Sequence, residues 1–323
     1  MISFSQNAIT LSAELLQRGY TYSEFIQERR YRQYLSPNGR LLLIKDAYYN
    51  YPFISQDVYA ISKDKLRSYA FAQSHGVRTP STLQTTSIEA AKQFLARYKR
   101  IIVKPVDGFG GKGLTVDVTS ELELQRAIDA AIFGSKEPLL QEQFIGEEIR
   151  LTVLNGQVRS VILRQTPRVV GDGTKSIAEL IEAENEERRN FQLPFNSYPP
   201  LSRSIVPDHF IHDDYIPKSN EIIELSRATM LRYGASFYGV TSRTHSSYIK
   251  IAEQLASQMD TAMLVVDLMV KDLTKPADDD NYIFLEFNTA PHLETYSLIR
   301  SGDQPDIIRI IADMIDAYSI SQG

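Results

Sequence analysis

The chain has 323 residues and a formal net charge of −5, with a pI near 5.7. This length is enough for roughly two or three packed lobes, and the acidic balance argues against a general nucleic-acid partner, which needs a basic surface. No apolar run is long enough for a transmembrane helix, and the lack of cysteine excludes disulfides, thiolate nucleophiles and cysteine-bound zinc. The first residues lack the basic and apolar pattern of a signal peptide, so we expect a cytoplasmic protein without a membrane partner.

Apolar periodicity and capping residues predict helices at residues 7–18, 62–74, 87–98, 120–133, 176–189, 246–259 and 304–319. Short apolar runs predict strands at residues 41–44, 101–104, 114–118, 139–142, 150–154, 158–163, 263–270 and 282–287. Asn155-Gly156 is a strong signal for a hairpin turn between two of these strands. Helices and strands alternate irregularly, so we predict an α+β fold rather than one parallel doubly wound sheet.

A glycine-rich loop follows the strand that ends in Lys104. The loop consists of Gly108, Phe109, Gly110, Gly111, Lys112 and Gly113. A lysine on a strand, beside a loop rich in backbone N–H groups, is suited to holding a polyphosphate. The glycine spacing also matches the dinucleotide-binding pattern, but that pattern needs a helix where this chain has a strand. A Walker A loop would need Ser or Thr at Gly113, and a hairpin without a ligand remains the alternative.

Three polar residues on two late strands could bind a hard cation. Asp267 interrupts an otherwise apolar strand, where an unpaired carboxylate is costly. Glu286 and Asn288 occupy alternate positions of the next strand, so their side chains point to one face. Two carboxylates and an amide carbonyl suit Mg²⁺, with Mn²⁺ as a second candidate metal. The alternative interpretation is that Asp267 forms a buried salt bridge to a Lys or Arg side chain. Phosphate and cation binding together suggest an ATP-using enzyme.

With these elements in order, the chain resembles the ATP-grasp superfamily of carboxylate–amine ligases from about residue 62 to residue 296. The likeness is strongest to the ATP-grasp parts of cyanophycin synthetase and of bifunctional glutathione synthetase. It rests on Lys104-Pro105 with the glycine loop, on Arg164 followed by Pro167 and Val170-Gly171-Asp172-Gly173, and on the helix start at residues 177–180. D-alanine–D-alanine ligase is similar in Asp64-Lys65-Leu66-Arg67, in Val266-Asp267-Leu268-Met269 and in residues 286–291.

The resemblance implies an ATP-grasp fold, in which ATP lies between two α+β lobes. We place a short N-terminal lobe at residues 1–61 and a small lobe with the glycine loop at residues 62–141. Residues 142–323 would form the large lobe, with the metal and substrate site. The second catalytic halves of the two relatives have no counterpart in this sequence, so we expect a stand-alone ligase.

The resemblance also assigns roles to single residues. Lys65 and Lys104 would hold the ATP phosphates, and the loop from Gly108 to Gly113 would close over them. The residues along the adenine would be Glu142, Gln143, Phe144 and Ile145, and Glu148 would bind the ribose. The magnesium ligands would be Asp267, Glu286 and Asn288. Arg164 and Arg227, with Lys104, would be catalytic. D-alanine–D-alanine ligase has an arginine at the position of Val265, near the reacting phosphate. In this chain, Arg164 and Arg227 would supply that positive charge. Gly239 stands where cyanophycin synthetase has an aspartate, which bears on recognition of the amine.

The implied reaction activates a carboxylate with ATP as an acyl phosphate, which an amine then attacks. We expect amino acids or short peptides as substrates, and a homodimer or homotetramer as the assembly. A D-alanine–D-alanine-ligase-like enzyme and a non-catalytic ATP-binding protein of the same fold are the alternatives.

Three further signals are interpreted as structural. His209-x-x-His212 with the acidic residues after it lies in a proline-flanked segment and is expected to be a solvated loop. The mixed charges at residues 184–189 predict an exposed helix end. The apolar stripe within residues 307–315 predicts a core-facing helix, with a dimer interface as the alternative.

Overall fold

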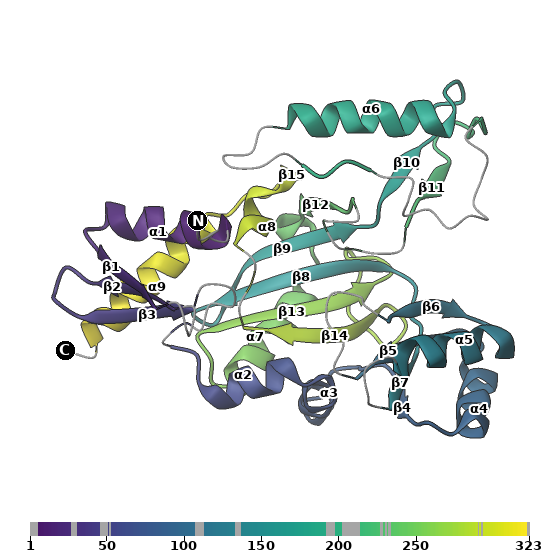
Figure 1. Cartoon of the computed structure of the whole chain (residues 1–323), viewed down its shortest axis with the longest axis horizontal. Coiled ribbons are helices and arrows are strands. Elements are labelled where there is room, and N and C mark those ends of the chain that lie inside the picture. The colour runs from purple at the N-terminus through teal and green to yellow at the C-terminus, as the bar shows by residue number, and fades with distance from the viewer. Residues whose placement is uncertain are drawn as a thin grey trace.

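The computed structural model describes residues 6–26, 31–45, 51, 53–106, 113–132, 137–191, 198–201, 214–226, 229, 231, 234–289, 291 and 293–321. Within them, a six-stranded sheet, a four-stranded sheet and two smaller sheets organise the chain (Figure 1). None of the described helices is long and apolar enough to cross a membrane.

The six-stranded sheet forms the centre of the molecule, in the order β14-β13-β8-β9-β12-β15. The strands are β8 (Glu147–Leu154), β9 (Gln157–Gln165), β12 (Ser236–Gly239), β13 (Met263–Val270), β14 (Tyr282–Asn288) and β15 (Ile299–Gly302). All neighbours are antiparallel except β12 and β15, which are parallel. Along β8, Ile149, Leu151 and Val153 belong to the core that includes α7 (Ser246–Gln258). The residues between them therefore point to the opposite face.

The four-stranded sheet, in the order β4-β7-β5-β6, forms a smaller lobe with its own core. Its strands are β4 (Thr82–Gln84), β7 (Pro138–Glu142), β5 (Ile101–Pro105) and β6 (Thr115–Val118). Helices α4 (Ile88–Tyr98) and α5 (Glu121–Ile132) pack against it. Both begin at predicted caps: Ser87 Oγ accepts from the Ala90 N–H, and Ser120 exchanges hydrogen bonds with Glu123.

The N-terminal part packs beside the large sheet (Figure 1). It contains α1 (Gln6–Gln17), β1 (Thr21–Ile26), β2 (Tyr31–Leu35), β3 (Leu41–Lys45), α2 (Gln56–Lys63) and α3 (Lys65–Ser74). Helix α1 contacts the closing helix α9 (Ile307–Ser321), whose Ile307, Ile311 and Ile315 are buried as predicted. The predicted helix at residues 62–74 is in fact two helices, because Asp64 ends α2 and caps α3. Tyr69 and Ala72 of α3 belong to the core of the large sheet. The predicted lobe boundaries, after residues 61 and 141, stay predictions.

A third small cluster stands at the far end of the large sheet (Figure 1). It combines α6 (Ile177–Asn190) with the two-stranded sheet of β10 (Arg168–Val170) and β11 (Ile222–Glu224). The capping box of Ser176 and Glu179 starts α6. The short elements η3 (Thr241–Arg243) and α8 (Glu294–Ser297) complete the described structure.

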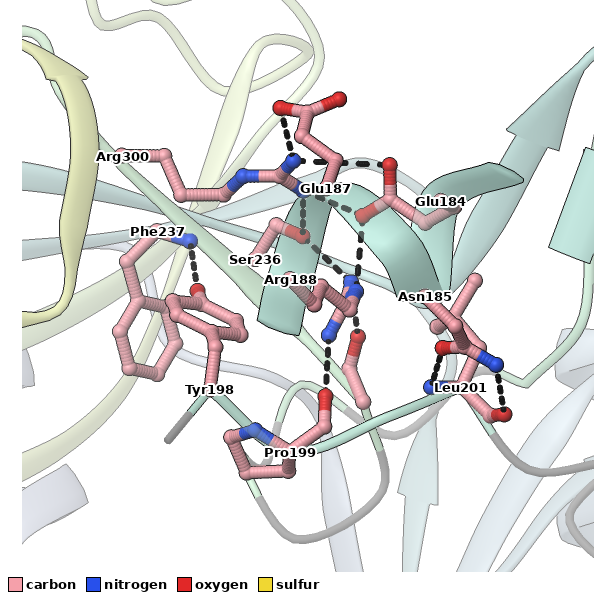
Figure 2. A network of polar contacts seen from close by, with 11 residues as sticks. Glu184, Asn185, Glu187, Arg188, Tyr198, Pro199, Leu201, Ser236, Phe237 and Arg300 are labelled. Carbon is pink, nitrogen blue, oxygen red and sulfur yellow. Dashed lines mark hydrogen bonds and ion pairs between the residues drawn. The ribbon is translucent and has the colours of Figure 1, made fainter. Parts of the chain in front are cut away.

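The prediction that residues 184–189 are an exposed helix end is wrong for Arg188. This side chain is 2% exposed and donates to Glu184, to Ser236 and to two backbone carbonyl oxygens, as Figure 2 shows. Of the charged side chains in this part of α6, Arg188 thus faces the protein interior, whereas Glu186, Glu187 and Arg189 are exposed.

Gly239 is required by a close approach between β12 and β15. A Cβ atom at Gly239 would lie 1.8 Å from the Asp303 carbonyl oxygen, and one at Gly302 would lie 2.0 Å from the Gly239 oxygen. A side chain therefore has no room at either position while the two strands keep this arrangement.

Candidate active site

An acidic pair lies at the centre of the large sheet. Asp267 in β13 stands directly between Glu286 in β14 and Arg150 in β8. Arg150 holds both oxygens of Asp267, with Nε–Oδ1 at 2.8 Å and Nη2–Oδ2 at 2.6 Å. Burial is the largest single influence and would raise the pKa of Asp267. The charge and hydrogen bonds of Arg150, together with Arg164 and Asn288, outweigh it and leave that pKa below its usual value. The salt bridge that the sequence left open is thus formed, and the metal role of Asp267 stays a prediction.

Asn288 joins the two carboxylates. Its Nδ2 donates to Asp267 Oδ2 at 3.2 Å and to Glu286 Oε1 at 3.1 Å, so two carboxylate oxygens converge on one small polar position. A half-turn of the amide would present its oxygen there instead. This donor set fits a hard divalent cation. Among the described residues, no group of three His, Cys, Asp or Glu residues could hold a metal ion, and the metal role of Asn288 stays a prediction.

Lys104 lies on β5 of the small sheet and contacts two polar side chains. Its Nζ donates to Gln141 Oε1 at 2.7 Å and lies 3.4 Å from the Tyr69 hydroxyl, which also accepts from Gln141 Nε2 at 2.9 Å. Burial lowers the pKa of Lys104 to about 8, and the charge of Glu286 opposes that shift. The small and large sheets meet through Tyr69, which accepts from Lys104 of β5 and has its ring centroid 6.1 Å from that of Phe284 in β14.

Lys63 is a second lysine whose charge is coupled to Glu286. Burial lowers the pKa of Lys63, and Glu286 opposes this shift as well. The predicted phosphate ligand Lys65 is the first residue of α3, and its charge acts on Tyr69 one turn later. The role of Lys65 stays a prediction, and Lys63 is a candidate that sequence reasoning missed.

Arg164 and Glu148 form a cross-strand ion pair between β9 and β8. Glu148 also accepts from the Thr229 hydroxyl, while Arg164 Nη2 donates to the Thr229 carbonyl at 3.1 Å. Burial raises the pKa of Glu148, although Arg164 and Thr229 act in the other direction. The Arg164 Nε is buried and has no hydrogen-bond partner among the described residues, so it can donate to an anion. Glu148 is engaged by Arg164, and its ribose role stays a prediction.

The connection between β7 and β8 links the two sheets (Figure 1). Glu142, the last residue of β7, pairs with Arg78 at 3.4 Å. The Phe144 ring has the Arg78 guanidinium and the Lys271 ammonium each 5.3 Å from its centroid. Such cation–π contacts hold this aromatic side chain in place at the junction of the sheets.

The rest of the connection is held by polar contacts and close packing. Gln143 exchanges two hydrogen bonds with Asp117, whereas the Ile145 side chain is exposed. A Cβ atom at Gly146 would lie 2.4 Å from the Val270 carbonyl oxygen, so the backbone passes directly over the end of β13. The adenine role of Glu142, Gln143, Phe144 and Ile145 stays a prediction.

Part of the predicted site cannot be placed. Gly108, Phe109, Gly110, Gly111, Lys112 and Arg227 lie outside the described residues, as do His209 and His212. Gly113, the last glycine of the loop, has a φ of +69°. The predicted roles of the loop and of Arg227 stay predictions.

Arg150, Gln141 and Tyr69 are site residues that sequence reasoning did not single out. Arg150 carried the same signal as Asp267, since it is a charged residue within an apolar strand. Gln141 and Tyr69 gave no comparable signal, because a glutamine in a short strand and a tyrosine in a helix are ordinary core residues.

A family model matches residues 64–191. It describes the ATP-grasp domain of prokaryotic glutathione synthetases. The cyanophycin synthetase of Crocosphaera subtropica is 28% identical over 78% of this chain and 30% of its own length. The bifunctional glutathione biosynthesis protein GshAB of Pasteurella multocida is 23% identical over 93% of this chain and 42% of its own length. The chain thus spans less than half the length of either relative.

The fold is shared with a solved structure. The crystal structure of the bifunctional glutathione synthetase from Pasteurella multocida aligns with 98% of this chain and 44% of its own, at a TM-score of 0.69 and 20% identity. An alignment over nearly the whole chain confirms the predicted α+β, ATP-grasp fold.

Proposed function

Because this chain has the ATP-grasp fold and carries an ATP-grasp domain, we propose that it is an ATP-dependent carboxylate–amine ligase. The observation that carries the proposal is that Lys104 of the small sheet contacts Tyr69, which packs on Phe284 of the large sheet, near the strand positions where Asn288 joins Glu286 to Asp267. An amino acid or short peptide would be activated as its acyl phosphate and then captured by an amine, with release of ADP and phosphate.

Each step builds negative charge on phosphoryl or carbonyl oxygens, so the residues mainly supply positioned positive charge. Lys104, with Lys63 or Lys65, would hold the phosphates of ATP. The Arg164 Nε is the donor left for a carboxylate or an acyl phosphate. Arg150 fixes both oxygens of Asp267 and so holds the acidic pair in register. When bound at this pair, Mg²⁺ would neutralise phosphate charge.

Arg150 is a candidate for the positive charge that an arginine at the position of Val265 would otherwise supply. That position has no arginine, but Arg150 lies on the neighbouring strand and reaches Asp267 on the same face. We therefore infer that Arg150 and Arg164 supply the positive charge beside the reacting groups. Because the charge comes from β8 and β9, a D-alanine–D-alanine-ligase-like mechanism is less well supported.

The test is a screen for ADP and phosphate release from ATP and Mg²⁺, with the amino acids supplied singly and in pairs. Release that needs both a carboxylate and an amine, together with a mass for the joined product, supports the ligase. ADP release that needs no amine would point to a kinase or hydrolase. ATP binding without turnover in any combination would favour the non-catalytic alternative.

In the same screen, Glu286→Ala is expected to reduce amine-dependent ADP release at least about 100-fold, because one of the two carboxylates of the cation grip is lost. Glu186→Ala, at an exposed position on helix α6, is the control and should retain activity. Turnover close to that of the unaltered chain in Glu286→Ala would remove this residue from the site. Oligomeric state can be measured on the same samples, and a homodimer or homotetramer stays our prediction.

A further inference from the structure

A cavity of about 310 Å³ lies between the large sheet and the small cluster of α6, β10 and β11. Gln165, Ser236 and Tyr238 line it from the sheet, and Arg300 from β15. Its volume is at the lower end of the range for ligand pockets, about 300–1,000 Å³, and pockets often form where two packed units meet. The cavity therefore suits a small ligand.

The cavity is on the other side of the sheet from the acidic pair. Arg164 in β9 and Phe237 in β12 are cross-strand partners, and the next pair along is Gln165 and Ser236. Since successive side chains on a strand point to opposite faces, Gln165 and Ser236 face away from Arg164. A molecule in this cavity is thus separated from the proposed reaction centre by the sheet itself.

Two charged groups of opposite sign are only partly satisfied at the cavity. Arg168 Nη2 donates to Thr166 and Glu147, each at 2.8 Å, and lies 3.6 Å from a Glu224 oxygen, but the buried Nε of Arg168 has no hydrogen-bond partner among the described residues. Glu187, whose side chain is 69% exposed, uses one oxygen for Arg300. Its second oxygen has no partner in the described chain. One wall thus offers a donor to an anion, and another offers an acceptor to a cation.

The groups between these two ends are part apolar and part ion-paired. Val169, Leu180 and Ala183 line the cavity. Arg300 is held by Glu184, which Arg188 also binds through Nε at 2.7 Å, as seen in Figure 2. These arginine–carboxylate contacts leave the Glu184 side of the cavity nearly neutral and rigid. A preformed pocket with one unused arginine donor and one unused carboxylate oxygen matches a small zwitterion.

We propose that this cavity binds a small zwitterion of the amino-acid class, with its carboxylate at Arg168 and its ammonium at Glu187. This site is separate from the catalytic site and goes beyond the proposed ligase activity. It does not depend on that activity, because neither ATP nor the acidic pair takes part in it.

The test is isothermal titration of the full chain, without nucleotide, against the twenty amino acids one at a time. At least one is expected to bind with a Kd of about 1 mM or tighter. Glu187→Gln and Arg168→Lys should each weaken it about tenfold or more, because each removes a charge-assisted hydrogen bond. Glu182→Gln is the matched control, since Glu182 lies on α6 with an equally exposed side chain but outside the cavity.

The Glu286→Ala variant separates this site from the catalytic one. It should bind the same amino acid unchanged even when it has lost ADP formation. The proposal is overturned if no amino acid binds at concentrations up to about 10 mM, ten times the expected Kd. It is also overturned if Glu187→Gln binds the amino acid as tightly as Glu182→Gln, or if Glu286→Ala abolishes binding. A thermal melt of each variant verifies that it is folded.

Discussion

Arg164 combines three kinds of contact that a single point charge could not make together. It pairs with Glu148, donates to the Thr229 backbone and lies over the Phe237 ring, with 5.8 Å between the guanidinium carbon and the ring centroid. A guanidinium is planar and presents five donors, so it can serve all of these contacts and keep Nε for a ligand. An ammonium group in its place would have to give up most of them.

We therefore expect Arg164→Lys to lower the rate of ADP formation about 10- to 100-fold, although the charge is kept. Steady-state kinetics with the substrate pair from the screen would measure this. Arg159→Lys, an exposed position on the same strand, is the control and should change little. Equal kinetics for the two variants would remove Arg164 from the site.

Lys104 predicts a specific pH dependence of nucleotide binding. Its pKa is lowered to about 8 by burial, so the free protein loses this charge as the pH rises through 8, well below the usual lysine range. ATP phosphates need the protonated form, and affinity for ATP should fall about fivefold between pH 8 and pH 9. Titrations in that range would measure it.

Lys104→Arg is the control for this pH effect. Arginine stays protonated throughout the range, so its affinity for ATP should be nearly flat between pH 8 and pH 9. A decline of the same size in both proteins would assign the effect to another group.

At the scale of elements, α6 shows how a buried charge can hold a peripheral helix on the sheet. Arg188 donates to Glu184 in its own helix and to Ser236 in β12, and its guanidinium lies 5.0 Å from the Tyr198 ring centroid (Figure 2). Its remaining donors bind the carbonyl oxygens of Pro199 and Gly234. One side chain thereby joins the helix, a strand and the segment at residues 198–201.

Arg188→Ala is expected to destabilise the protein by about 3 kcal/mol, because the other groups of this network stay buried without their partner. Thermal unfolding, followed by circular dichroism, measures the effect. The adjacent Arg189→Ala is the control, because that side chain is 59% exposed and its loss should change stability little. Equal melting temperatures for the two variants would contradict the structural role of Arg188.

The predictability of the elements depended on their length and on local signals. The caps Ser87, Ser120 and Ser176 marked helix starts correctly, and Asn155-Gly156 formed the expected turn, with φ angles of 50° and 73°. Strands β12 and β15 were missed, because four residues give too little periodicity and their parallel pairing joins residues about 60 positions apart. Arg188 was misjudged because its partners come from distant segments.

At the scale of the whole molecule, the proposed site depends on two sheets and on α3 being brought together. Sequence motifs identified Lys104, Asp267, Glu286 and Asn288, because each stands in an apolar strand or in a recognisable run. They could not identify the Gln141–Tyr69 support of Lys104, since it arises only when the small sheet meets α3.

Ligand binding between the lobes should therefore stabilise the whole chain. With ATP and Mg²⁺ at 100 times their Kd, we expect about 2.7 kcal/mol of added stability, seen as a higher melting temperature. Chelation of the metal with EDTA should remove most of this gain. The Glu286→Ala variant should show little metal-dependent gain, and a full gain in that variant would argue against the cation grip.

The contact of Gly239 with Gly302 has a consequence for the substitutions that this edge of the sheet can accept. A side chain at either position would separate β12 from β15 and withdraw Arg300 from its carboxylate partners. Neither glycine can therefore be exchanged while the other strand stays in place. A side chain at position 239 would therefore be accommodated only together with a second change that moves β15.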